Sequence, residues 1–301
     1  MILCFPAQPR IQLDYPPMAD QDTSLKTRIE RFFAAGAAAV GDSGAMHAFA
    51  ELREALEAGK VRAAEPDAAS PIGWRVNAWV KQGILLGFRL GVTKEVGGDE
   101  FSFVDKHTFP MRRFTAEDGV RIVPGGSSVR AGAYLAKGVI CAPPMFVNVG
   151  AYVDEASMID SHALVGSCAQ IGKRVHLSAA AQVGGVLEPV NASPVILEDD
   201  VLVGGNCGIY EGTIVRKKAV LAAGTILTRG TPVYDVVNGE VLRASGDKPL
   251  IIPEGAVVVP GARSIAKGKG AQWDISVYTP VIVKYRDEKT ELSLVLEDLL
   301  R

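Results

Sequence analysis

Apolar residues recur at every sixth position through the middle of the chain, with glycine and short polar residues between them. The register holds from position 123 to 183 and again from 197 to 233. A period of six fits neither an α-helix nor an alternating strand, but it is typical of a parallel β-helix, in which each hexapeptide forms a short strand and a corner. The repeating apolar residues, here called anchors, are Val123, Val129, Leu135, Cys141, Val147, Val153, Ile159, Val165, Ile171, Leu177, Val183, Leu197, Val203, Ile209, Val215, Leu221, Leu227 and Val233. The pattern predicts a triangular prism over residues 121–235, with three repeats to a coil and the anchors inside.

The segment "GGVLEPVNASPVI" interrupts the period. Leu177 and Leu197 are twenty residues apart, whereas one full coil takes eighteen. If Leu197 stacks on Leu177, the additional residues leave the prism as a loop over 184–196. Loops on repeat solenoids often form a binding face, although a harmless insertion remains the alternative.

The flanking regions follow other patterns. Helical spacing in "SLKTRIERFF", "HAFAELREALEAG" and "VNAWVKQGILLGFRL" predicts an N-terminal helical domain over 21–120. Residues 1–20 are expected to form a flexible tail, with Met1 or Met18 as the true start. After the prism, 236–301 is expected to hold strands at "GAVVVPG" and "DISVYTPVIVKY" and a helix at "ELSLVLEDLLR", as a cap on its open end. The expected fold is therefore mainly β, a parallel β-helix between a helical domain and a small β/α cap.

Composition and charge exclude several classes of protein. The chain has 301 residues, 48% of them hydrophobic and 22% charged, as in ordinary globular proteins. Its net charge of −2 argues against nucleic acid or an acidic membrane surface as partner. No apolar run reaches the roughly 18 residues of a membrane-spanning helix, so a cytoplasmic protein is expected. The four cysteines are far apart without a CxxC pair, and the histidines are poorly spaced for a shared metal ion, so no metal site is predicted.

Counting by the register predicts a column of very small residues on the outside of the prism: Asn148, Gly166, Gly184, Gly204 and Ala222. Such a column would let an extended ligand with amide groups, such as a pantetheine arm, lie against the backbone. Gly184, Gly204 and Ala222 are the candidates for this contact. Alternatively, the position simply favours small residues beside a corner.

Asp160 is the one carboxylate in the middle of the preceding column, in "SMIDSHALVG", with His162 two residues further on. Acyl transfer to an amine needs a base to take up the amine proton, and aspartate, glutamate or histidine can serve. A carboxylate at a corner can instead cap backbone amides, and a lone histidine can simply be solvated.

The run "FVNVGAYVDEASMIDSHALVGSCAQIGKRVHLS", followed by "VGGVLEP", resembles the tetrahydrodipicolinate N-succinyltransferases of diaminopimelate and lysine synthesis. The resemblance extends from "GWRVNAWVKQGILLGFRL" to "YTPVIVKYRD", which is most of the chain. It implies a left-handed β-helix, a homotrimer and active sites between neighbouring subunits. It also implies transfer of succinyl from succinyl-CoA to the amino group of a ring-opened cyclic imine dicarboxylate, without a tightly bound cofactor.

Specific residues carry the resemblance further, and two depart from it. Arg121 matches a substrate-binding arginine of the family, and Asp160 matches an aspartate that contacts the amino group of the substrate. Gly208 stands where many members carry a candidate catalytic glutamate, and His162 stands where tryptophan is usual. Either Glu211 replaces the missing carboxylate or Asp160 acts alone with water. Other possibilities are an acetyl-CoA donor or a related amino-dicarboxylate acceptor, and a non-catalytic β-helix scaffold.

Overall fold

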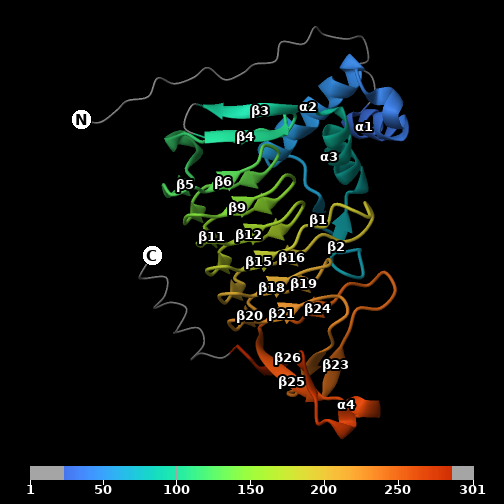
Figure 1. Cartoon of the computed structure of the whole chain (residues 1–301), viewed down its shortest axis with the longest axis vertical. Helices are drawn as coiled ribbons and strands as arrows, with labels where there is room; N and C mark the ends of the chain where they lie inside the picture. The colour runs from blue at the N-terminus through green and yellow to red at the C-terminus, as the bar shows by residue number, and fades with distance from the viewer. Residues whose placement is uncertain (1–23, 99–100, 287–301) are drawn as a thin grey trace, which may run out of the picture.

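The computed structural model describes residues 24–98 and 101–286 and forms a long column, with helices at one end and a β-cap at the other (Figure 1). The tail predicted over 1–20 and the helix predicted at "ELSLVLEDLLR" lie outside the described residues. The centre is a parallel β-helix of short strands, which confirms the fold predicted from the period of six.

Each coil contributes one strand to each of three faces. The first face holds β5 (Arg121–Ile122), β8 (Ile140–Cys141), β11 (Met158–Ile159), β14 (His176–Leu177), β17 (Leu202–Val203), β20 (Val220–Leu221) and β25 (Ala256–Ser264). The second holds β6 (Ser128–Val129), β9 (Phe146–Val147), β12 (Leu164–Val165), β15 (Gln182–Val183), β18 (Gly208–Ile209) and β21 (Ile226–Leu227). The third holds β7 (Tyr134–Leu135), β10 (Tyr152–Val153), β13 (Gln170–Ile171), β16 (Ile196–Leu197), β19 (Ile214–Val215) and β24 (Ile251–Ile252).

One continuous apolar core fills the prism, built mainly from the second residue of each strand. Because successive coils pair in parallel, these residues stack in columns, and each coil contacts only its neighbours. The predicted anchors are buried here, with one change at the first coil. Ile122, and not Val123, pairs with Cys141, because Gly125 and Gly126 lengthen the first corner.

The register predicted across the loop is wrong. Leu177 pairs with Val203, while Leu197 pairs with Ile171, a separation of 26 residues. The chain leaves the second face at β15 and rejoins at the next face in order, so the loop between β15 and β16 adds eight residues to the usual eighteen. The error arose because counting anchors cannot show which face a strand enters after an insertion.

The coil also continues past position 235, where the sequence pattern had ended it. Ile251–Ile252 pairs with β19, and the start of β25 pairs with β20, so both segments extend the prism. The excursion before them forms the hairpin of β22 (Val233–Asp235) and β23 (Glu240–Leu242). The rest of β25 pairs antiparallel with β26 (Ser276–Tyr285), with α4 (Gly268–Gln272) between them, so both predicted strands are confirmed.

The N-terminal region packs three helices on each other: α1 (Leu25–Ala34), α2 (Ser43–Glu57) and α3 (Ala78–Leu90), with short 3-10 turns at Gly36–Ala39 and Ala116–Asp118. Asp42 caps α2, since its Oδ1 accepts the Ala45 N–H at 3.0 Å. Glycine allows α3 to lie close to α2, because a Cβ at Gly87 would fall 2.1 Å from the Phe49 ring. The range 21–120, predicted as a helical domain, also contains the antiparallel hairpin of β3 (Thr93–Gly98) and β4 (Phe101–Lys106).

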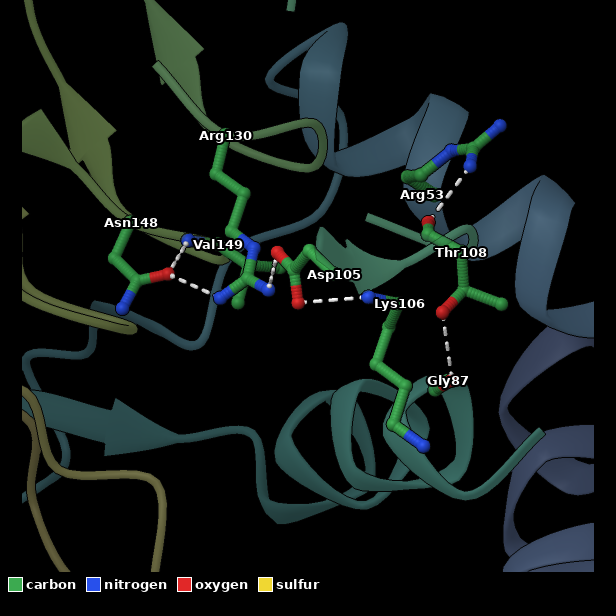
Figure 2. A network of polar contacts seen from close by, with 8 residues as sticks. All are labelled: Arg53, Gly87, Asp105, Lys106, Thr108, Arg130, Asn148 and Val149. Carbon is green, nitrogen blue, oxygen red and sulfur yellow. Dashed lines mark hydrogen bonds and ion pairs between the residues drawn. The ribbon is translucent and has the colours of Figure 1, made fainter. Parts of the chain in front are cut away.

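Polar contacts join the helical region to the first coils (Figure 2). Arg130 reaches Asp105 of β4 at 2.5 Å and donates to Asn148 Oδ1 of the next coil at 3.5 Å. Arg53 of α2 donates to the Thr108 carbonyl at 2.8 Å, and the Thr108 hydroxyl donates to the Gly87 carbonyl at 3.0 Å. The helices are therefore held against one end of the prism.

The third face is covered by the chain itself. The hairpin of β1 (Ala64–Pro66) and β2 (Trp74–Val76) lies over it, and the Arg62 guanidinium lies 3.7 Å from the centre of the Tyr152 ring. Trp74 Nε1 and Arg216 Nη1 both donate to Glu198 Oε1, at 2.9 and 2.6 Å. Within residues 24–98 and 101–286, it is therefore the first and second faces that remain open for contact with other molecules.

Candidate active site

Asp160 lies at the corner between the first and second faces, directly after β11. Its Oδ1 accepts the backbone N–H of Ser161 at 2.6 Å. Within residues 24–98 and 101–286, no hydrogen bond or ion pair occupies its Oδ2. The side chain is half-buried, so one oxygen is fixed to the corner while the other can accept a proton or a hydrogen bond from a ligand.

The predicted single column of small residues is wrong, because it depended on the incorrect register across the loop. Gly166 and Gly184 follow strands of the second face, and the next residue of their column is Tyr210. Gly204 and Ala222 follow strands of the first face and belong to the Asp160 column. That column reads Ala142, Asp160, Ser178, Gly204 and Ala222. A strip of short side chains therefore runs along the corner from Asp160.

Packing between coils explains two of these glycines without a ligand. A Cβ at Gly166 would lie 2.2 Å from the backbone N of Gly185, and a Cβ at Gly204 would lie 2.5 Å from the N of Ala223. Backbone atoms cannot move aside as a flexible side chain can. Glycine is therefore required at both positions by the approach of the next coil.

Arg121 begins β5, two strands from β11 in the same sheet. Two strand spacings amount to about 10 Å, which places Arg121 and the Asp160 column on neighbouring parts of one face. The side chain is exposed, and no carboxylate of the described residues pairs with it. Its guanidinium is available to bind a carboxylate in a bidentate manner.

Glu211 lies elsewhere, at the corner between the second and third faces, in a left-handed backbone conformation with φ of 53°. Its Oε2 accepts the Arg229 N–H at 2.8 Å. Asp160 and Glu211 therefore stand on opposite edges of the second face and on different coils. One chain does not bring the two predicted catalytic carboxylates together.

A cavity of approximately 820 Å³ lies beside Glu211, under the loop between β15 and β16. Its wall includes Gly184, Tyr210, Glu211 and Arg229, together with loop residues such as Ala192. The sequence pattern left the loop as either a binding face or a harmless insertion, and it could not place Glu211 and Gly184 in the same cavity. The residues brought together here belong to consecutive coils.

Tyr210 fills the space outside Gly208, a position without a side chain. A Cβ at Gly208 would lie 2.4 Å from Tyr210 Cε2 and 2.9 Å from its hydroxyl oxygen. Tyr210 lies two residues after Gly208, just past the end of β18, and this spacing is the sequence signal that was missed. Any larger residue at 208 must displace the tyrosine ring.

A double-mutant cycle tests this contact. We expect Gly208→Ala to destabilise the protein by about 1 kcal/mol, because Tyr210 must leave its place. In a Tyr210→Ala background the same change should have almost no effect, and urea unfolding of the four proteins gives the coupling energy. Equal effects in both backgrounds would show that the ring does not fill this space.

His162 occupies a corner with φ of 62°. Its backbone N–H donates to the Pro144 carbonyl at 2.5 Å, and its carbonyl accepts from Gln182 Nε2 at 3.0 Å.

The described residues include no group of histidine, cysteine and carboxylate side chains able to hold a metal ion. None of the helices in that same part of the chain combines the length and the apolar character needed to cross a bilayer.

The stacked two-residue strands and the inserted loop define a hexapeptide-repeat protein. The family profile "Hexapeptide repeat of succinyl-transferase" matches residues 194–229, and the profile "Tetrahydrodipicolinate N-succinyltransferase N-terminal" matches residues 24–90. Together with the relatives described next, these matches show that the chain belongs to the tetrahydrodipicolinate N-succinyltransferase family.

Three relatives illustrate the similarity, all named 2,3,4,5-tetrahydropyridine-2,6-dicarboxylate N-succinyltransferase. The protein of Polynucleobacter asymbioticus is 41% identical over 82% of this chain and 86% of its own length. That of Nitrobacter hamburgensis is 43% identical over 83% and 90%. That of Sodalis glossinidius is 38% identical over 92% and 98%, so the similarity spans nearly the whole relative.

Proposed function

We propose that this protein transfers succinyl from succinyl-CoA to the amino group of tetrahydrodipicolinate, in its ring-opened 2-amino-6-oxopimelate form, within diaminopimelate and lysine synthesis. The observation that carries the proposal is the identity of about two residues in five with relatives of that name over four-fifths of the chain. The Asp160 column supplies a place where such a reaction can proceed.

In the proposed reaction the substrate amine attacks the thioester carbonyl and forms a tetrahedral oxyanion. Asp160 takes up the amine proton through Oδ2, while Ser161 N–H holds Oδ1 in place. The C–S bond then breaks, an amide remains, and CoA leaves as a thiolate that takes the proton from Asp160 and becomes the thiol, so the carboxylate is regenerated. Backbone N–H groups stabilise the oxyanion, and Arg121 binds a carboxylate of the acceptor.

The thioester arm is proposed to follow the small residues Gly204 and Ala222 along the Asp160 corner. Gly184 lies on the opposite edge of the second face, so it is proposed as a further contact supplied by a neighbouring chain. Glu211 is the alternative base, and it can join Asp160 only across two chains. A homotrimer with sites between neighbouring chains is therefore part of the proposal, and the open first and second faces support it.

Cytoplasmic location is proposed too, because the described cysteines form no disulfide, as expected in a reducing compartment.

The donor and acceptor are tested by measuring release of free CoA thiol with 2-aminopimelate as acceptor analogue. We expect release with succinyl-CoA to exceed release with acetyl-CoA by at least about tenfold, since a site built for a terminal carboxylate leaves charged groups unpaired with acetyl. A preference for acetyl-CoA would contradict the donor assignment. Absence of CoA binding by calorimetry would favour a non-catalytic scaffold.

A further inference from the structure

Lys81 on α3 is completely buried. Removing an ammonium group from water is unfavourable by several kcal/mol unless a partner compensates. Within residues 24–98 and 101–286, no carboxylate forms an ion pair with it, and burial lowers the pKa of its amino group. Stability therefore does not explain why a lysine stands here.

The contact of Lys81 points to the loop between β15 and β16. Its Nζ donates to the Ala192 carbonyl at 2.6 Å. Ala192 closes a turn of the loop, since its own N–H donates to the Pro189 carbonyl at 3.0 Å. The Lys81 side chain thus links the helical region to this turn of the loop.

The other side of the same turn contacts the coil that carries Glu211. A Cβ at Gly212 would lie only 2.6 Å from the Ser193 carbonyl oxygen, so loop and coil meet without room for a side chain. Ala192, Ser193, Glu211 and Gly212 all line the cavity. The loop turn is therefore fixed between Lys81 and the corner of Glu211.

The first half of the loop has supports of its own. Val186 N–H donates to the Ser167 carbonyl at 3.2 Å, and Leu187 packs against the core of the helices. The second half, at 189–193, has the Lys81 contact as its link to α3. Loss of that link is expected to release the part of the loop that forms the cavity wall.

We propose that Lys81 is a positioning residue, which holds the loop turn at Ala192 so that the cavity keeps the shape that receives the succinyl-CoA arm. The choice of succinyl-CoA rests on the proposed function, because Gly184, a proposed contact of the arm, lines this cavity. The hydrogen bond from Lys81 to the Ala192 carbonyl does not depend on the proposed function, because the geometry of the loop alone supports it.

The test compares Lys81→Met with Lys60→Met, which removes an exposed lysine. Hydrogen exchange followed by mass spectrometry is measured on peptides covering 186–193, beside thermal unfolding and steady-state kinetics. In Lys81→Met we expect exchange about tenfold faster in the loop, the effect of losing one hydrogen bond from a charged donor. KM for succinyl-CoA should rise about tenfold with kcat changing less than threefold, while the unfolding temperature stays the same or rises.

The outcomes test the contact between Lys81 and Ala192 separately from the proposed function. Unchanged exchange in Lys81→Met overturns the proposal, and faster exchange with unchanged KM overturns the positioning role. If the wild-type protein shows no succinyl transfer, the proposed function fails, but loop exchange still decides whether Lys81 holds the turn. Should Lys81→Met not fold, Lys81→Gln keeps a neutral N–H donor group and is expected to show a smaller change of the same sign.

Discussion

Replacing Asp160 by asparagine should lower kcat/KM about 100- to 10,000-fold, the range typical for loss of a general base. Asparagine keeps an oxygen that accepts the Ser161 N–H, so the corner stays folded, but its amide cannot take up the amine proton. The affinity for CoA should change little, because the arm is proposed to lie along Gly204 and Ala222. Initial rates of CoA release and calorimetric titration with CoA measure the two quantities.

Asp154→Asn is a closely matched control. Asp154 occupies the same position of its repeat, is equally half-buried, and accepts the next backbone N–H at 2.8 Å. It lies directly after β10, at the corner between the third and first faces and therefore away from the Asp160 corner. We expect wild-type turnover from this variant. Wild-type turnover from Asp160→Asn as well would move the base to Glu211 or to another group.

Replacing Gly166 by alanine should destabilise the protein by about 1 to 3 kcal/mol, as overpacking does. The new methyl group would lie 2.2 to 2.6 Å from backbone atoms of Gly184 and Gly185, so the coils must separate to admit it. The clash is with Gly184 and Gly185, where the loop between β15 and β16 begins. Both residues line the cavity, so the cavity wall should shift too. Urea unfolding measures the loss of stability.

Gly230→Ala supplies the comparison, because a Cβ at Gly230 meets no atom within 4 Å. Its free energy of unfolding should stay within about 0.5 kcal/mol of the wild type. If Gly166→Ala unfolds like the wild type but loses CoA binding, the glycine serves a ligand rather than the packing of coils.

The period of six was enough to predict the β-helix, because an apolar residue repeated at fixed spacing can be buried only if the chain winds at the same spacing. The same reasoning located Asp160 and the loop. It failed after residue 183, since two added residues and eight differ by one full period of six and look alike to a count of anchors once the period resumes. The consequence was a column that joined Gly184 to Gly204, which lie after strands of different faces.

The sequence by itself determined the repeat, the helices that precede it, the family and the identity of the candidate residues, because these depend on local spacing and residue type. Only the tertiary structure decided which residues share a corner, that Asp160 and Glu211 stand apart, that Tyr210 fills the space at Gly208, and that Lys81 reaches Ala192. These relations join segments far apart in the chain. They follow from how coils stack and where an inserted loop returns, which no single segment encodes.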